Sequence, residues 1–166
     1  MDEHLRNGNG KIGAVAVLGG GIAGMQASLD LAESGFKVYL VERASGIGGH
    51  MAQLDKTFPT NDCAMCTISP RLVECAKHPN IEIITHTEVV SAAGEAGNFD
   101  LSLRQRPSYV DSEKCNACGD CQAVCPVQLP DEFNQGLAPR QVIHKLYPQT
   151  IPNVYTIDKG PPPPAG

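Results

Sequence analysis

The sequence predicts an α/β fold in two parts: a Rossmann-like βαβ domain over residues 12–108, and a small ferredoxin-like module over residues 109–159. Three observations support this prediction. A short apolar run leads directly into a Gly-x-Gly-x-x-Gly loop. A helical pattern and a second apolar run follow that loop. Beyond residue 111, cysteine, glycine and proline dominate, which indicates a boundary near Ser108.

The first unit can be predicted element by element. Residues 12–18 (IGAVAVL) are rich in β-branched side chains, which is typical of a buried strand. Apolar residues at helical spacing predict a helix over residues 22–34, with Gly35 as its stop. Residues 37–41 (KVYLV) predict a second strand, which ends at Glu42. About 30 residues are enough for a right-handed parallel crossover.

Later elements carry weaker patterns. Residues 43–61 contain three glycines and one proline, Pro59, and are expected to be irregular. Ser69 and Pro70 offer an N-cap and a first helical residue. The remaining expected ranges are a helix over 70–77, a strand over 81–85, and a hairpin of 89–93 and 99–106 around 94–98.

Composition narrows the classes of protein. The chain has 166 residues, of which 42% are hydrophobic, enough for a core. Its formal net charge is -5 and its Lys and Arg are scattered, which argues against a nucleic-acid partner. No apolar run is long enough to span a membrane. Residues 1–11 lack a signal-peptide core and are expected to be flexible, and the proline-rich tail, residues 160–166, is expected to be extended or disordered.

The seven cysteines are an odd number and occur in tight clusters. A secreted disulfide framework would more often show an even, dispersed set. The pattern therefore favours a reducing cytoplasm in which thiolates are reserved for metal.

The cysteine run at residues 115–126 (CNACGDCQAVCP) is the most specific signal. Its C-x2-C-x2-C-x3-C-P spacing predicts a [4Fe–4S] cluster bound by Cys115, Cys118, Cys121 and Cys125. In two-cluster ferredoxins the fourth cysteine ligates the other cluster. Cys125 therefore either completes the local cluster or has its partners elsewhere. A zinc knuckle is the alternative, but zinc sites usually separate two C-x2-C pairs by a long gap.

The glycine loop predicts a dinucleotide site. Gly19, Gly21 and Gly24 match G-x-G-x-x-G between a strand and a helix, and Glu42 ends the next strand. These glycines would make the tight turn, admit a pyrophosphate and let the helix pack on the strand, while Glu42 would take ribose hydroxyls. The alternative is a glycine-rich turn without a ligand. A second glycine cluster within residues 42–49 favours FAD over NAD. The expected cofactor contacts are Gly19, Gly21, Ile22, Ala23, Gly24, Glu42, Arg43, Gly48 and Gly49.

The other cysteines are less specific. Cys63 and Cys66 form a lone C-x2-C, which fits a redox dithiol, half of a metal site, or a structural pair. Cys75 lies inside a predicted helix and is expected to be a buried small hydrophobe. His50, His78 and His86 lie near in sequence and are not expected to be ligands.

Taken together, several segments resemble the A-type subunits of heterodisulfide reductase, a family of iron–sulfur flavoproteins. They cover most of residues 14–159 and are the glycine loop at 17–32, LDKTFPTNDCAMC at 54–66, HPNIEIIT at 78–85, the cysteine run, and YPQTIP at 147–152. The resemblance implies a thioredoxin-reductase-like FAD domain with an inserted ferredoxin module. It also implies that Cys63 and Cys66 help to bind a further, unusual cluster. Family members are longer and continue with a second cysteine run after residues 156–159, so this chain is expected to match their front portion.

The resemblance implies an oxidoreductase subunit that transfers electrons in a heterodisulfide reductase-like complex. In that family FAD can split an electron pair between high- and low-potential acceptors, which is flavin-based electron bifurcation. The implied partners are iron–sulfur and disulfide-reducing subunits and an electron donor of the hydrogenase or formate dehydrogenase type. No residue is expected to be catalytic, because the cofactors carry the redox chemistry. The alternatives are a flavin-free iron–sulfur adaptor and a structural zinc module.

Overall fold

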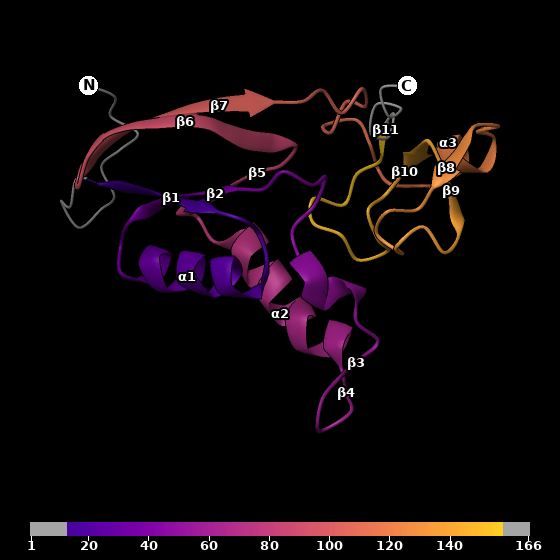
Figure 1. Cartoon of the computed structure of the whole chain (residues 1–166), viewed down its shortest axis with the longest axis horizontal. Coiled ribbons are helices and arrows are strands. Elements are labelled where there is room, and N and C mark those ends of the chain that lie inside the picture. Colours follow the sequence, from indigo (N-terminus) through magenta and orange to yellow (C-terminus); the bar gives the residue numbers. More distant parts are fainter. Residues whose placement is uncertain (1–12, 158–166) are drawn as a thin grey trace, which may run out of the picture.

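A computed structural model describes residues 13–157, and its centre is a three-stranded parallel sheet (Figure 1). The strands are β1 (Ala14–Leu18), β2 (Lys37–Val41) and β5 (Ile81–Ile84), with β2 in the middle. Helix α1 (Ile22–Glu33) connects β1 to β2, so the predicted βαβ unit is confirmed. The expectations for residues 1–11 and 160–166 lie outside the described residues.

Helices α1 and α2 (Ala64–Lys77) cover one face of the sheet (Figure 1). The core lies between these helices and the inward side chains of the strands. Its fully buried members include Met25, Val38, Leu40, Ile47, Ile68 and Cys75.

The prediction that the first strand is buried was wrong. β1 is an edge strand, and Ala14, Ala16 and Leu18 are exposed, Leu18 by 58%. They point away from the helices, whereas Val17 packs against the core. An uninterrupted apolar run predicts burial on both faces, but here the helices cover only one of them.

Helix α2 begins six residues earlier than predicted. Cys63 is its N-cap, and the Cys63 sulfur accepts a hydrogen bond from the Cys66 amide at 3.1 Å. Pro70 therefore lies inside the helix rather than at its first position. A proline removes the hydrogen bond to the carbonyl four residues earlier, here that of Cys66. Cys66 and Pro70 are both exposed, so water can solvate that carbonyl.

Residues 43–61 are mostly irregular, as expected, apart from the 3-10 helix η2 (Gly49–Gln53) and the short strand β3 (Lys56–Thr57), which pairs with β4 (Asp62–Cys63). The predicted hairpin is confirmed and is longer than expected: β6 (Thr87–Glu95) pairs with β7 (Asn98–Gln105). It lies on the opposite side of the sheet from the helices (Figure 1).

The cysteine-rich module contains only short elements, as its composition predicts. They are α3 (Asp120–Ala123), β8 (Gln128–Pro130) paired with β9 (Pro139–Gln141), and β10 (Ile143–His144) paired with β11 (Thr156–Ile157). Between β10 and β11 the chain returns to the first domain, where Ile151 forms an antiparallel bridge with Ile47. We call residues 147–155 the docking segment.

Between residues 13 and 157, no helix combines the length and apolar character that crossing a membrane requires.

Cys75 should be chemically inert in the folded chain. The residue is fully buried, and its sulfur lies 3.7 Å from the Met25 carbonyl oxygen. Burial, followed by the neighbouring Glu74 carboxylate, raises the pKa of Cys75 to about 11. The thiol therefore stays protonated at neutral pH. We expect iodoacetamide to modify Cys75 in urea but not in the native chain. Site-resolved mass spectrometry measures this difference. Native modification as fast as that in urea would contradict this packing.

Candidate functional site

The first glycine loop lies at the carboxyl end of β1 and is shaped by close backbone contacts. The Gly19 amide donates a hydrogen bond to the Val41 carbonyl at 2.8 Å, which ties the loop to the end of β2. A Cβ atom on Gly24 would overlap the Gly19 carbonyl oxygen. Gly24 is thus what allows α1 to pack closely against β1, the role predicted for it.

Gly21 has a different environment. A Cβ atom on Gly21 would meet no atom of the chain within 4 Å, so internal packing does not require glycine there. Gly21 is the N-cap of α1, and no side chain caps this end of the helix. Ile22 and Ala23, in the first helical turn, are exposed. Open space in front of uncapped amides suits a phosphate group, because the helix dipole and free N–H groups both favour an anion.

Glu42 follows β2 at the same edge of the sheet. Its Oε2 accepts a hydrogen bond from the Gly20 amide at 2.7 Å, and its Oε1 accepts one from the Ala44 amide at 2.8 Å. An ionised carboxylate offers about four acceptor positions, so it can also accept hydrogen bonds from ribose hydroxyls. Glu42 thus lies beside the glycine loop, where the dinucleotide prediction requires it.

We call the second glycine cluster, residues 46–49, the second glycine loop. It packs directly on the first glycine loop. The Gly48 amide donates to the Gly20 carbonyl at 2.7 Å. A Cβ atom on Gly49 would come within 2.9 Å of the Gly21 Cα. The structure therefore brings together Gly19, Gly21, Gly24, Glu42, Gly48 and Gly49 at one edge of the sheet.

Arg43 directly follows Glu42 and lines a cavity of about 250 Å³ between the two parts of the chain, together with His86, Arg106 and Arg140. The Arg106 guanidinium donates a hydrogen bond to the Arg43 carbonyl at 2.7 Å. The predicted contact between Arg43 and a cofactor thus stays a prediction.

The docking segment is a part of the site that sequence reasoning did not identify. A Cβ atom on Gly46 would overlap Thr150 Oγ1, and one on Gly48 would lie 2.6 Å from the Tyr147 hydroxyl. The missing side chains of Gly46 and Gly48 therefore make room for the cysteine-rich module. The motif YPQTIP, one of the segments that carry the family resemblance, was the only signal that could have marked this segment.

Three of the four clustered cysteines line one cavity. Cys115, Cys118 and Cys121 share a space of about 310 Å³ with Tyr155. Cys125 does not line this cavity; its sulfur lies 3.6 Å from the Val127 carbonyl oxygen. Backbone hydrogen bonds, at Val127 first, lower the pKa of Cys125.

The cysteine cavity suits a cluster better than a single ion. Within residues 13–157, no three His, Cys, Asp or Glu side chains converge on a position for one metal ion. Zinc needs four donors within roughly 2.0–2.3 Å of one centre. In a [4Fe–4S] cluster each iron takes its own thiolate, so the ligand sulfurs stand apart around a shared space.

Tyr155 closes one side of the cysteine cavity. Its side chain is only 6% exposed, and its amide points at the Cys115 sulfur at 3.4 Å. Burial raises the pKa of Tyr155, and thiolates at Cys121, Cys118 and Cys115 raise it further. Such amide-to-sulfur hydrogen bonds are one way in which a protein tunes a cluster's potential.

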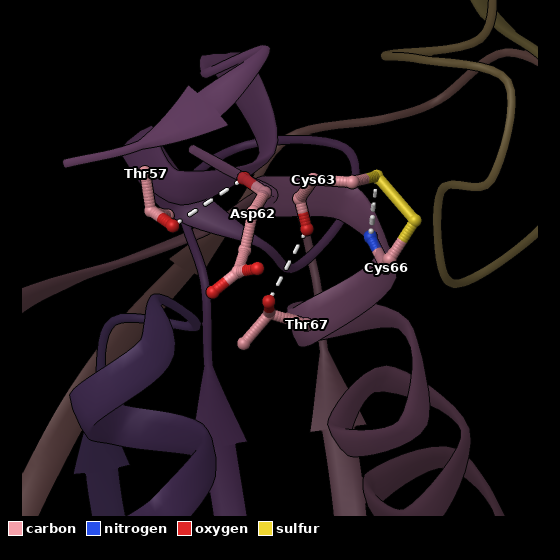
Figure 2. Close-up of a disulfide and its surroundings, with 5 residues drawn as sticks. All are labelled: Thr57, Asp62, Cys63, Cys66 and Thr67. Atoms are coloured by element: carbon pink, nitrogen blue, oxygen red, sulfur yellow. Dashed lines mark hydrogen bonds between the residues drawn. A yellow bond between two sulfur atoms is a disulfide. The ribbon is translucent and has the colours of Figure 1, made fainter. Parts of the chain in front are cut away.

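The C-x2-C pair lies at the N-terminus of α2, on the exposed β3–β4 hairpin side (Figure 2). Cys63 and Cys66 form a disulfide with a Cα–Cα distance of 5.2 Å, and both residues are exposed. Thr67 Oγ1 donates to the Cys63 carbonyl at 3.2 Å. A disulfide cannot ligate metal, so the predicted ligand role applies to the reduced pair and stays a prediction.

Two family models match the chain. The model described as an NAD(P)-binding Rossmann-like domain matches residues 17–82. The model described as a 4Fe-4S binding domain matches residues 108–130. The predicted fold, a Rossmann-like domain followed by an iron–sulfur module, is confirmed.

The chain is also similar to much longer proteins. It is 52% identical over 141 residues to an iron-sulfur A-type subunit of the CoB–CoM heterodisulfide reductase of Methanopyrus kandleri, covering 85% of this chain and 22% of that protein. It is 53% identical over 142 residues to the A-type subunit of the H(2)/formate:CoB-CoM heterodisulfide,ferredoxin reductase of Methanococcus maripaludis, covering 86% and 22%. The chain thus spans about a fifth of the length of these relatives.

Among solved structures, L-proline dehydrogenase from P. horikoshii matches 56% of this chain and 20% of its own, with a TM-score of 0.46 and 23% identity.

Two glycine substitutions should separate packing from ligand binding. We expect Gly24→Ala to lower the melting temperature, because its methyl group would overlap the Gly19 carbonyl. Gly21→Ala should lower the melting temperature much less than Gly24→Ala, since only the N-cap preference for glycine over alanine is lost. It should weaken dinucleotide binding, because its methyl group would enter the open space in front of α1. Thermal unfolding and ligand titration of both variants check this. A Gly21→Ala chain that binds as well as wild type would show that no phosphate lies there.

Proposed function

Over the residues that it shares with these relatives, the chain belongs to the family of heterodisulfide reductase A-type subunits, and we propose that it is an electron-transfer component of a FAD- and iron–sulfur-dependent oxidoreductase complex. The observation that carries this proposal is the short path between the two candidate cofactor sites. Ile151 pairs with Ile47 in the second glycine loop, and Tyr155 borders the cysteine cavity. Four residues span at most about 14 Å, so the docking segment keeps the two sites close.

The glycine loops and Glu42 would hold FAD. Gly21 and the first turn of α1 leave space and free amides for the pyrophosphate, and Glu42 would accept the ribose hydroxyls. Bound FAD would supply exchange of both electron pairs and single electrons. The residues of this chain would bind and orient it, and none of them need transfer a proton.

The cysteine run would hold the [4Fe–4S] cluster. Cys115, Cys118 and Cys121 would ligate three irons from one cavity, with the Tyr155 amide directed at the Cys115 sulfur. Cys125 would complete the cluster or, given its separate position, reach a second one. When reduced, Cys63 and Cys66 would contribute two thiolates to a further cluster, whose other ligands come from elsewhere.

The proposed partners follow from the names of the relatives. Those names describe subunits of heterodisulfide reductases, one of them linked to hydrogen or formate and to ferredoxin. We assign this chain the corresponding partners: iron–sulfur and disulfide-reducing subunits, and a hydrogenase or formate dehydrogenase type of donor. A reducing cytoplasm suits thiolate-bound clusters.

A flavin-free iron–sulfur adaptor is the second candidate. The open edge and exposed face of β1 favour it, because a three-stranded sheet shields one side of a nucleotide only partly.

The two candidate functions differ in the flavin content that they predict. We expect the chain purified without oxygen to carry close to one FAD per chain, measured by flavin absorption after denaturation. Iron and sulfide without flavin would support the adaptor.

The cluster assignment predicts a contrast between two cysteines. Cys118→Ala should remove most of the iron and acid-labile sulfide of the anaerobic chain, because one ligand of the cavity is lost. Cys75→Ala is the control, since Cys75 lies in the apolar core away from that cavity. Iron analysis per folded chain decides the matter. Full iron content in Cys118→Ala, or zinc in place of iron, would contradict the assignment.

A further inference from the structure

Tyr147 is buried in the contact between the two parts of the chain. Its side chain is 5% exposed and belongs to the core cluster of the first domain. Its ring stacks on Phe133 with the ring centroids 5.2 Å apart. The Tyr147 hydroxyl donates a hydrogen bond to the Ile47 carbonyl, 100 residues away in sequence. Burial raises the pKa of Tyr147 to about 12, so the hydroxyl keeps its proton at physiological pH.

Ile47 transmits this contact to the candidate FAD site. Its side chain is fully buried and fills the space where Gly20 has no Cβ atom. Its amide donates to the Ile151 carbonyl at 2.9 Å, so the docking segment holds Ile47 through both its amide and its carbonyl. The next residue, Gly48, donates to the Gly20 carbonyl at 2.7 Å. An unbroken series of contacts therefore runs from Tyr147 to the first glycine loop.

We propose that the Tyr147 hydroxyl is a positioning group that holds the second glycine loop closed on the first, and thereby makes FAD binding depend on docking of the iron–sulfur module. This inference rests on the proposed function, since it concerns the same FAD site. Tyr147 itself need not touch the cofactor.

The energetic reason is the burial of the Ile47 carbonyl. If the hydroxyl is removed, a buried acceptor loses its partner unless the loop shifts toward water. A shifted loop would no longer pack on Gly20, so only a fraction of the chains would be ready to bind FAD. Apparent affinity falls by that same fraction. Linkage also works in reverse, so bound FAD must strengthen the docking contact.

The test is Tyr147→Phe in the full chain, which keeps the ring stacked on Phe133 and removes only the hydroxyl. We expect FAD to bind about tenfold more weakly, the free-energy scale of one buried unpaired acceptor. The iron and sulfide content should stay unchanged, and so should the midpoint potential of the flavin that does bind, because it binds to the same closed loop and the loop equilibrium weakens both redox states equally. Tyr39→Phe, the same chemical change on β2, is the matched control and should bind FAD as wild type does.

The outcomes separate the two proposals. Wild-type FAD affinity in Tyr147→Phe would overturn this inference and leave the proposed function intact. A parallel loss of FAD and iron would also overturn it, because it would mark Tyr147 as generally structural. A wild-type chain that binds no FAD would overturn the flavin role and this inference with it. If the variant does not fold, amide exchange in the wild-type chain decides: saturating FAD must slow exchange at Ile47, and unchanged exchange there would overturn the coupling.

Discussion

Two glycines, Gly46 and Gly48, determine how closely the two parts of the chain approach each other, and a third, Gly20, determines how closely the two glycine loops pack. Gly20 leaves space for Ile47, Gly46 for Thr150, and Gly48 for the Tyr147 hydroxyl. With these side chains absent, the two glycine loops and the docking segment pack in direct contact. Backbone hydrogen bonds from Gly48 to Gly20 and from Ile47 to Ile151 then hold the loops to each other and to the module. The second glycine loop contacts both the first glycine loop and the docking segment. The arrangement of both candidate cofactor sites therefore depends on this contact.

Local patterns were sufficient to predict the first half of the fold. The strand–loop–helix–strand unit appeared with nearly the predicted bounds, because β-branched strands, a glycine loop and helical spacing agree with one another over residues 14–41. Predictions were wrong where tertiary context decides. β1 is exposed on one face because the helices cover only the other, and α2 begins at Ala64 because a cysteine caps it. No simple pattern identifies a cysteine as an N-cap or places Pro70 on a solvent-facing side of a helix.

The candidate sites, like the fold, contain parts that local patterns predict and parts that depend on tertiary context. Spacing alone predicted that Cys115, Cys118 and Cys121 act together, since two-residue gaps leave a tight loop few alternatives. Spacing also marked Cys125 as the uncertain ligand, and the structure does separate it from the shared cavity. The docking segment could not be predicted, because its partners lie about 100 residues earlier in the chain. The sequence predicts Gly48 as a cofactor contact and places Gly46 in the same glycine cluster, yet the missing side chains of both also accommodate Tyr147 and Thr150.

We propose that one chain joins a flavin site to a cluster site and passes electrons between them. Flash photoreduction of bound flavin in the anaerobic chain tests this proposal, with cluster reduction followed by its absorption and EPR signals. Transfer within a chain predicts a cluster-reduction rate that is independent of protein concentration. A rate that rises in proportion to concentration, or a cluster that stays oxidised while the flavin is reduced, would contradict the claim.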